Sequence, residues 1–312
     1  ASKSVEKASQ SFAAAAASYP YGGFDMKKLI SLLLAACLFC GAVPALALDA
    51  GEARAVIGAD LTDEQIAAVY ASFGVERGSV TELRVTNADE RKYLEGYVDE
   101  SLIGTHSISC VYIEVLDEGE GLEVSTSNVN WCSSEMYVSA LATAGVSDAR
   151  IIVAAPYEVS GTAALTGVYL AYEDITGEAL DETAKLVGTQ ELSLTAKLAE
   201  QLGGYDSVEI VNELKLLLGE TKNMTDAQLR EEIRAVAKEF GVTLTDTQVE
   251  QLAGLCRSLE KLDPDQLKEK VESVQDALGK LGQAKEAVSG FFEGVKQVWN
   301  SVVNFFKGLF GA

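Results

Sequence analysis

The stretch SISCVYIEVLDEGEGLEVSTSNVNW, residues 107–131, contains two β-rich runs separated by an acidic, glycine-containing turn. The runs are residues 107–116 and 122–131, and both are rich in β-branched and aromatic side chains. The turn is the segment DEGEG at residues 117–121. Short runs of this composition on either side of a turn indicate two strands joined as a hairpin.

The neighbouring segments extend this pattern in both directions. We expect a strand at residues 80–86 and a helix at 88–98, then a helix at 134–144 and a last strand at 149–155. This βαββαβ order is the split βαβ arrangement of ferredoxin-like folds. We therefore predict an α+β fold whose four-stranded antiparallel sheet has helices on one face and right-handed crossovers.

Helix-start signals lie on both sides of the predicted sheet. Thr62 and Gln65 have the spacing of a capping box, and this spacing returns at residues 225/228 and 245/248. Beyond Pro156 the sequence has helical periodicity to its end. We predict an α+β domain at 48–175 that begins with a helix, an all-helical C-terminal part with a domain at 176–283, and a terminal helix at 284–312.

Composition excludes one class of partner. The chain has 312 residues, a formal net charge of −22 and 48% hydrophobic residues, which is typical of a globular protein. Nucleic-acid binding needs clustered Lys and Arg to neutralise phosphates, and the sequence lacks such clusters. We expect no nucleic-acid partner.

Residues 26–47 have the three parts of a secretory signal peptide. Lys27 and Lys28 follow Met26, residues 29–39 form a short apolar run, and Ala45-Leu46-Ala47 is a small-x-small cleavage site. We expect cleavage after Ala47, which gives a secreted or extracytoplasmic protein associated with the cell envelope. Residues 1–25 are then translated upstream DNA and not part of the protein.

Cysteines bear on both anchoring and oxidation. Residues 34–37 have the form of a lipobox ending at Cys37, so a lipoprotein anchor is the less favoured alternative. After cleavage, Cys110, Cys132 and Cys256 remain, so at least one thiol is unpaired within a monomer. Cys110 and Cys132 lie on neighbouring predicted strands. The sequence is compatible both with a disulfide between them and with two free thiols.

The segment Ser160-Gly161-Thr162 follows the last predicted strand and precedes a helix. Backbone amides at a helix N-terminus hold anions, so these three residues form a candidate anion-binding site. The alternative interpretation is that Ser160 caps the helix, while small residues such as Gly167 let it pack closely on the sheet. No Lys follows as in a phosphate-binding loop.

Other polar groups have structural explanations that we favour. His106 is the only histidine, and we expect it to be a structural residue at the start of a strand. The acidic turn could offer oxygen ligands to Ca²⁺, but a solvated hairpin tip explains the same residues. Asn87, Asp89 and Glu90 could form a polar site, but Asn87 with Glu90 could also cap a helix. We expect no metal and no cofactor, because no metal, dinucleotide or P-loop motif is present.

The C-terminal segment from residue 287 is aromatic-rich and amphipathic. Three sets of apolar residues with seven-residue spacing merge into one broad face. These candidate contact residues are Phe291, Phe292, Val295, Val298, Trp299, Val302, Phe305, Phe306 and Leu309. We expect this helix to bind a membrane surface or a hydrophobic protein groove. Packing of this helix onto the protein's own core requires the same apolar face and is the alternative interpretation.

The chain resembles the YpuA-like predicted secreted proteins of Gram-positive bacteria, a family that carries a domain of unknown function. The likeness rests on residues 58–62, 85–90, 103–105, 128–131 and 140–167. Its most specific block is APYEVSGTAALTG at 155–167. The resemblance implies secretion, and it brings no known activity or site residues.

These features favour an exported, non-enzymatic binding protein of the cell envelope. No combination of residues meets the geometric requirements of catalysis. The alternative is a secreted hydrolase or carbohydrate-processing enzyme that uses acidic residues, Ser160 or Asn130 in the α+β domain. Carboxylates that converge in a cleft would favour the enzyme.

Overall fold

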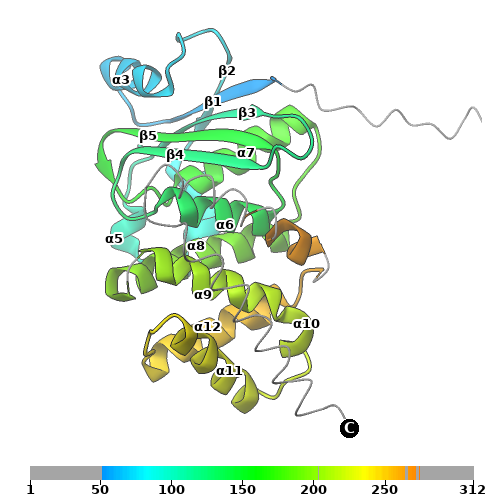
Figure 1. The fold of residues 1–312 in the computed structure, drawn as a ribbon. Coiled ribbons are helices and arrows are strands. Elements are labelled where there is room, and N and C mark those ends of the chain that lie inside the picture. Colours follow the sequence, from blue (N-terminus) through cyan, green and yellow to red (C-terminus); the bar gives the residue numbers. More distant parts are fainter. Residues whose placement is uncertain (1–50, 203, 264–265, 272–273, 275–312) are drawn as a thin grey trace, which may run out of the picture. The chain divides into compact units, whose positions relative to one another are not determined.

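The computed structural model describes residues 51–202, 204–263, 266–271 and 274 (Figure 1). The expected signal peptide at 26–47, the upstream segment 1–25, Cys37 and the C-terminal helix at 284–312 lie outside the described residues. Within the described part of the chain, no helix is long and apolar enough to cross a membrane.

The sheet has five strands in the spatial order β2-β1-β3-β5-β4. It is mixed, because β1 pairs parallel to β2 and β4 parallel to β5, whereas β3 pairs antiparallel to both β1 and β5. The strands are β1 (Ala53–Gly58), β2 (Thr81–Val85), β3 (Cys110–Val115), β4 (Leu122–Val129) and β5 (Ala149–Val159). The α+β class is confirmed, and the four strands expected from residue 80 onward all form.

The ferredoxin-like topology is not what the structure shows. Strand β1 was not predicted, and β5 lies between β3 and β4, so the expected hairpin does not form. The ends of the turn bond to the start of β5 instead: the Leu116 amide donates to the Asp148 carbonyl at 2.7 Å, and the Ala149 amide donates to the Gly121 carbonyl at 3.1 Å. Asp148 Oδ1 also accepts from the amides of Gly119 and Gly121. These bonds hold the two strands apart.

Helices fill the remaining described segments. The predicted helix at 134–144 is confirmed. The one expected at 88–98 forms only as far as Leu94, as α4, and the short helix α5 lies beyond it. The capping boxes at Thr62, Thr225 and Thr245 are all present. The helices are α3 (Asp63–Phe73), α4 (Asn87–Leu94), α5 (Glu100–Ile103), α6 (Ser134–Ala144), α7 (Ala164–Thr176), α8 (Glu182–Leu202), α9 (Gly204–Leu216), α10 (Leu218–Thr221), α11 (Asp226–Glu239) and α12 (Asp246–Leu259).

Helices cover both faces of the sheet, so the expectation of helices on one face is wrong (Figure 1). Side chains alternate between the faces along each strand. Ala55 and Ile57 of β1 pack with α3, whereas Val56 packs with α7 on the opposite face. Helix α3 therefore covers a smaller core on the face opposite the main one.

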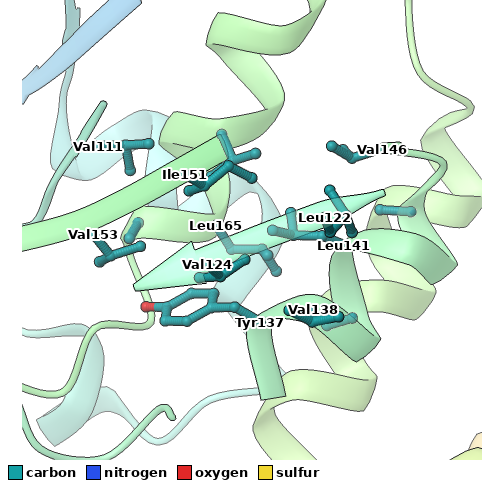
Figure 2. Close-up of a cluster of buried hydrophobic side chains, with 14 of the residues drawn as sticks. Val111, Leu122, Val124, Tyr137, Val138, Leu141, Val146, Ile151, Val153 and Leu165 are labelled. Atoms are coloured by element: carbon teal, nitrogen blue, oxygen red, sulfur yellow. The ribbon is translucent and has the colours of Figure 1, made fainter. Parts of the chain in front are cut away.

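The main core lies between the sheet and helices α6, α7 and α8 (Figure 2). Its labelled members are Val111, Leu122, Val124, Tyr137, Val138, Leu141, Val146, Ile151, Val153 and Leu165. Full burial of a side chain of this size contributes about 1.5–3 kcal/mol. This core holds the strand ends and the start of α7 in fixed positions.

A second core joins helices α8 to α12. Helix α8 contributes to both cores, with Leu192 facing the sheet side and Leu198 facing the helical side. The predicted domain boundary at residues 175–176 stays a prediction.

Candidate functional site at the carboxyl edge of the sheet

Strand directions bring most candidate residues to one end of the sheet. The parallel pairs β1/β2 and β4/β5 all end there, and the antiparallel strand β3 begins there. This carboxyl edge consists of residues 58–62, 85–90, 101–109, 128–132 and 155–163, at the end of the sheet nearest α5 in Figure 1. In open sheets of this kind, ligands bind outside the carboxyl ends of the strands.

Hydrogen bonds join these segments directly. The Ala59 amide donates to the Val85 carbonyl at 2.9 Å, and the Cys132 amide donates to the Ser160 carbonyl at 3.1 Å. The Ser107 amide donates to Asp60 Oδ2 at 2.7 Å. The loops at the carboxyl edge are therefore held to one another as well as to the strands.

A bulge in β5 shapes the edge beside β4. Ser127 pairs with Ala154 but Val129 pairs with Val159, so residues 155–158 lie opposite Asn128 alone. Asn128 adopts the left-handed conformation, with φ of 58°, and its side-chain amide donates to the Ala155 carbonyl at 2.7 Å. Bulges redirect side chains next to binding sites, and here the bulge leaves the Glu158 side chain exposed.

A hollow of 310 Å³ opens at this edge. We call it the edge hollow. Its polar lining residues are Ser101, His106, Ser109, Asn130, Glu158, Ser160 and Thr162. Its apolar lining residues are Leu102, Ile103, Ile108, Val159 and Ala163. The structure thus brings Ser160 and Thr162 together with His106 and Asn130, which sequence analysis had treated separately.

The turn into α7 forms one wall of the edge hollow. Ser160 Oγ donates to the Leu102 carbonyl at 3.1 Å, and Ala163, not Ser160, is the N-cap residue of α7. The alternative interpretation that Ser160 caps the helix is therefore wrong. The close packing expected of Gly167 is confirmed, because a Cβ there would lie 3.3 Å from Val111 Cγ2.

Two hydrogen-bonding groups of the hollow have no partner among the described residues. Within the described part of the chain, the amide of the lining residue Thr162 donates to no other group. Ser109 is only 4% exposed, and its hydroxyl makes no hydrogen bond with any described residue. Buried polar groups are normally satisfied, so partnerless donors in a hollow point to a ligand or to water.

The arrangement of side chains does not activate a nucleophile. His106 lies exposed in the loop before β3 and not at a strand start, and its Nδ1 is 3.0 Å from Thr105 Oγ1. No hydrogen bond between described residues joins His106 to Ser160 or Ser109. Nucleophilic catalysis requires such a bond between nucleophile and base.

A buried carboxyl group lies behind the hollow wall. Glu90 is fully enclosed and accepts a hydrogen bond from the Ser107 hydroxyl, and Ser107 stands between two lining residues of the hollow. Burial, with a smaller contribution from the neighbouring Asp60, raises the pKa of Glu90 to about 7. The helix cap expected at Asn87 and Glu90 is wrong, because Thr86 and Asp89 form the capping box.

A second titratable cluster is sealed inside the protein. Lys215 Nζ lies 2.9 Å from Ser139 Oγ and 2.6 Å from Glu191 Oε1, at the contact of α6, α8 and α9. Burial lowers the pKa of the Lys215 ammonium group. A serine beside such a lysine resembles a catalytic pair, but neither residue lines a described hollow. This cluster is part of the core.

The acidic turn has a structural role. Asp148 holds its glycine amides, and Glu123 pairs with Arg150 at 3.0 Å. Among the residues that the structure describes, no group of three or more His, Cys, Asp or Glu is placed to hold a metal ion. The turn lines a second hollow of 480 Å³ together with Val146, Lys270 and other residues.

Comparison with known proteins places the chain in a family. Residues 57–277 match the model described as "Protein of unknown function (DUF1002)". The chain is also 34% identical over 293 residues to the "Uncharacterized protein YpuA" of Bacillus subtilis (strain 168), covering 90% of this chain and 100% of the relative.

The chain belongs to the DUF1002 family. The resemblance inferred from the sequence motifs is therefore confirmed. No solved structure matches. The segments that carried the resemblance at 58–62, 85–90, 103–105 and 128–131 lie at the carboxyl edge, as do residues 155–163 of the segment 140–167.

Two members of this edge are not predicted from the sequence. Ser109 belongs to a run that indicates only a strand, and Glu158 follows an apolar run whose expected end is residue 155. Glu90 is named from the sequence, either in a polar site or in a helix cap. One signal is present in the sequence: Glu158 is the first charged residue after the apolar run, and polar groups near strand ends often contact ligands.

Proposed function

We propose that the chain is an exported, non-enzymatic binding protein of the cell envelope, and that the edge hollow is its ligand site. One observation carries the proposal: two lining residues of the hollow have a hydrogen-bond donor without a partner among the described residues, namely the amide of Thr162 and the hydroxyl of Ser109. A ligand that accepts hydrogen bonds would satisfy both groups.

The candidate anion-binding residues Ser160, Gly161 and Thr162 form the donor side of this site. They precede α7, a helix of 13 residues whose N-terminal end carries a partial positive charge. Amides in this position hold acceptor oxygens such as those of a carboxylate or phosphate. The proposal therefore places an acceptor oxygen of the ligand at this turn.

Binding is favoured over hydrolysis by the hydrogen bonds of the candidate catalytic groups. Ser160 donates to a backbone carbonyl, and the His106 ring contacts Thr105. Neither contact prepares a nucleophile. A hydrolase with its site in the α+β domain is the second candidate, and it is supported by the presence of Ser160, His106 and Glu158 in one hollow.

Export and membrane contact complete the proposal, and both rest on sequence features. Residues 26–47 have the form of a signal peptide that is cleaved after Ala47. From residue 287 onward the charged residues are Glu293, Lys296 and Lys307, so this segment has a net charge of +1. A cationic, aromatic-rich amphipathic segment suits an anionic membrane surface, and a hydrophobic protein groove is its alternative partner.

The ligand site is tested with the form that begins at Leu48. Thermal shifts and calorimetry are measured with small carboxylates, phosphate, sugars and peptides. A compound that binds wild-type protein should bind Ser109→Ala about tenfold more weakly, because one hydrogen bond is lost. Ser72→Ala on exposed helix α3 serves as the matched control and should bind normally. Binding that is equal in all three proteins would place the ligand elsewhere.

Turnover decides between the two candidate functions. The same protein is incubated with ester, peptide and glycan substrates, and we expect no turnover above buffer. Activity that disappears in Ser160→Ala or His106→Ala would establish the hydrolase instead.

Export and membrane contact are tested separately. N-terminal sequencing of secreted protein should begin at Leu48, and a lipid-modified Cys37 would contradict this. Deletion of residues 285–312 should abolish co-sedimentation with anionic liposomes without lowering the unfolding temperature. A large loss of stability without any lipid binding by the full chain would show that the segment belongs to the core.

A further inference from the structure

We propose that the edge hollow binds a small zwitterion, an amino acid or a short peptide with free termini. Its carboxylate would accept from the Thr162 amide and the Ser109 hydroxyl, and its ammonium group would pair with Glu158. This inference rests on the proposed function, because it names the ligand class of the same site.

The carboxylate half is supported by the shape of the turn into α7. Two donors without partners in the lining, the Thr162 amide and the Ser109 hydroxyl, match the two oxygens of a carboxylate. Gly161 has a φ of 91°, which turns the backbone away from the strand before α7 begins. The Ser109 hydroxyl belongs to a residue that is 4% exposed, and it is a donor that does not depend on the helix end.

The ammonium half is supported by the charges around the hollow. Glu158 is exposed and forms no ion pair with any described residue. Among the described residues, no Lys or Arg lines the hollow. A ligand that carries only negative charge would be repelled by Glu158 and by a chain with a formal charge of −22. A positive group on the ligand removes this repulsion.

Size and lining restrict the ligand further. The volume of 310 Å³ is at the low end of the range of about 300–1,000 Å³ that is typical of small-molecule sites. A ligand of one or two amino-acid residues suits this space. Ile108, Val159 and Ala163 provide an apolar wall for a small side chain. A neutral sugar would use the donors but would leave the Glu158 charge without a counter-charge.

The test is calorimetry at neutral pH with a matched set of probes. These are L-alanyl-L-alanine, its N-acetyl derivative, its C-terminal amide, inorganic phosphate and methyl glucoside. We expect the dipeptide to bind, and each blocked derivative to bind at least tenfold more weakly. Glu158→Gln should lower the affinity for the dipeptide to that for the N-acetyl derivative. The N-acetyl derivative itself should bind the wild-type protein and the variant with equal affinity.

Glu118→Gln is the matched control, because this exposed carboxylate lines the other hollow. It should leave dipeptide affinity unchanged, and circular dichroism confirms that both variants are folded. If no probe binds, the proposed function fails together with this inference. If phosphate or the glucoside binds and the dipeptide does not, the edge hollow is still supported as a ligand site, but the proposal of a zwitterionic ligand is wrong. If the N-acetyl derivative binds as well as the dipeptide, the pairing with Glu158 is wrong.

Discussion

The Tyr137 hydroxyl donates a hydrogen bond to the carbonyl oxygen of Gly161, so helix α6 holds the turn that leads into α7. The same carbonyl accepts from the Ala164 amide at 3.0 Å. The Tyr137 side chain is fully buried in the main core, as Figure 2 shows. The position of the candidate binding amides is thus determined by core packing as well as by the loop sequence.

Replacing Gly161 by Ala should destabilise the protein by at least about 2 kcal/mol, because left-handed backbone is strained for alanine. The added Cβ would also lie 2.5 Å from Val129 Cγ1 and 2.7 Å from Tyr137 Oη. Urea unfolding measures the change.

Gly177→Ala is the control for backbone strain alone. Gly177 ends α7 with a φ of 67°, and a Cβ there would meet no atom within 4 Å. We expect a loss of about 1 kcal/mol. Equal losses at the two positions would show that the contacts with Val129 and Tyr137 are unimportant.

Stability should fall as the pH rises toward neutrality, and Glu90 should cause part of the fall. Burial raises its pKa from 4.5 to about 7, so the folded state favours the protonated form. The stabilisation is complete below about pH 4.5 and is lost as the pH rises through about 7. The pKa shift of Glu90 corresponds to a contribution of about 3 kcal/mol to the free energy of unfolding. Glu90→Gln should flatten the curve of unfolding free energy between about pH 5 and pH 8.

Glu213 provides a comparison in the helical part. Burial and the nearby Glu239 raise its pKa to about 7 as well. Glu213→Gln should remove a separate part of the same pH dependence, and the double variant should have the flattest curve. A Glu90→Gln protein whose curve is as steep as that of wild type would mean that Glu90 is already ionised at low pH.

Lys215→Met should cost about 3–5 kcal/mol, because it leaves the Glu191 carboxylate buried without its counter-charge. The two side chains are 0% and 1% exposed and their atoms lie 2.6 Å apart. Replacing both residues, as Lys215→Met with Glu191→Leu, should recover much of the loss. Chemical denaturation measures both variants. No recovery in the double variant would show that Ser139 and Thr143 depend on the charges for their own hydrogen bonds.

The form that begins at Leu48 should contain three free thiols and no disulfide. Cys110 and Cys132 pack on opposite faces of the sheet, in different cores. They therefore cannot form the disulfide that was considered for two neighbouring strands. Burial raises the pKa of Cys110, Cys132 and Cys256 to about 12. A thiol reagent should label none of them quickly in native protein and all three in concentrated guanidinium chloride. Fewer reactive thiols after unfolding would reveal a disulfide.

Local signals in the sequence were sufficient for most elements. The helix at 134–144 and the capping boxes at Thr62, Thr225 and Thr245 formed as predicted, because their hydrogen bonds join residues three or four apart. The exception is β1, whose sequence ARAVIG at residues 53–58 is short and has little polar alternation. Without β1, the parallel pairing with β2 could not be foreseen.

The candidate site was predictable only in part. Ser160, Gly161 and Thr162 were identified because a strand followed by a glycine turn and a helix is a local pattern. Ser109 and Glu158 join them only because β3 and β5 are neighbours in the sheet. That pairing links residues about forty positions apart in the sequence. The periodicity of hydrophobic residues within each strand cannot predict it.

The sequence by itself determined the α+β class, most helices and strands, and membership of the DUF1002 family, since each depends on neighbouring residues or on similarity along the chain. The tertiary structure alone decided the strand order and the convergence of five loops at the carboxyl edge. The physical reason is the choice of backbone partner: Leu116 and Gly121 bond to the start of β5 and not to each other. That choice depends on packing across the whole sheet, because the strand that fills the gap is encoded almost thirty residues downstream.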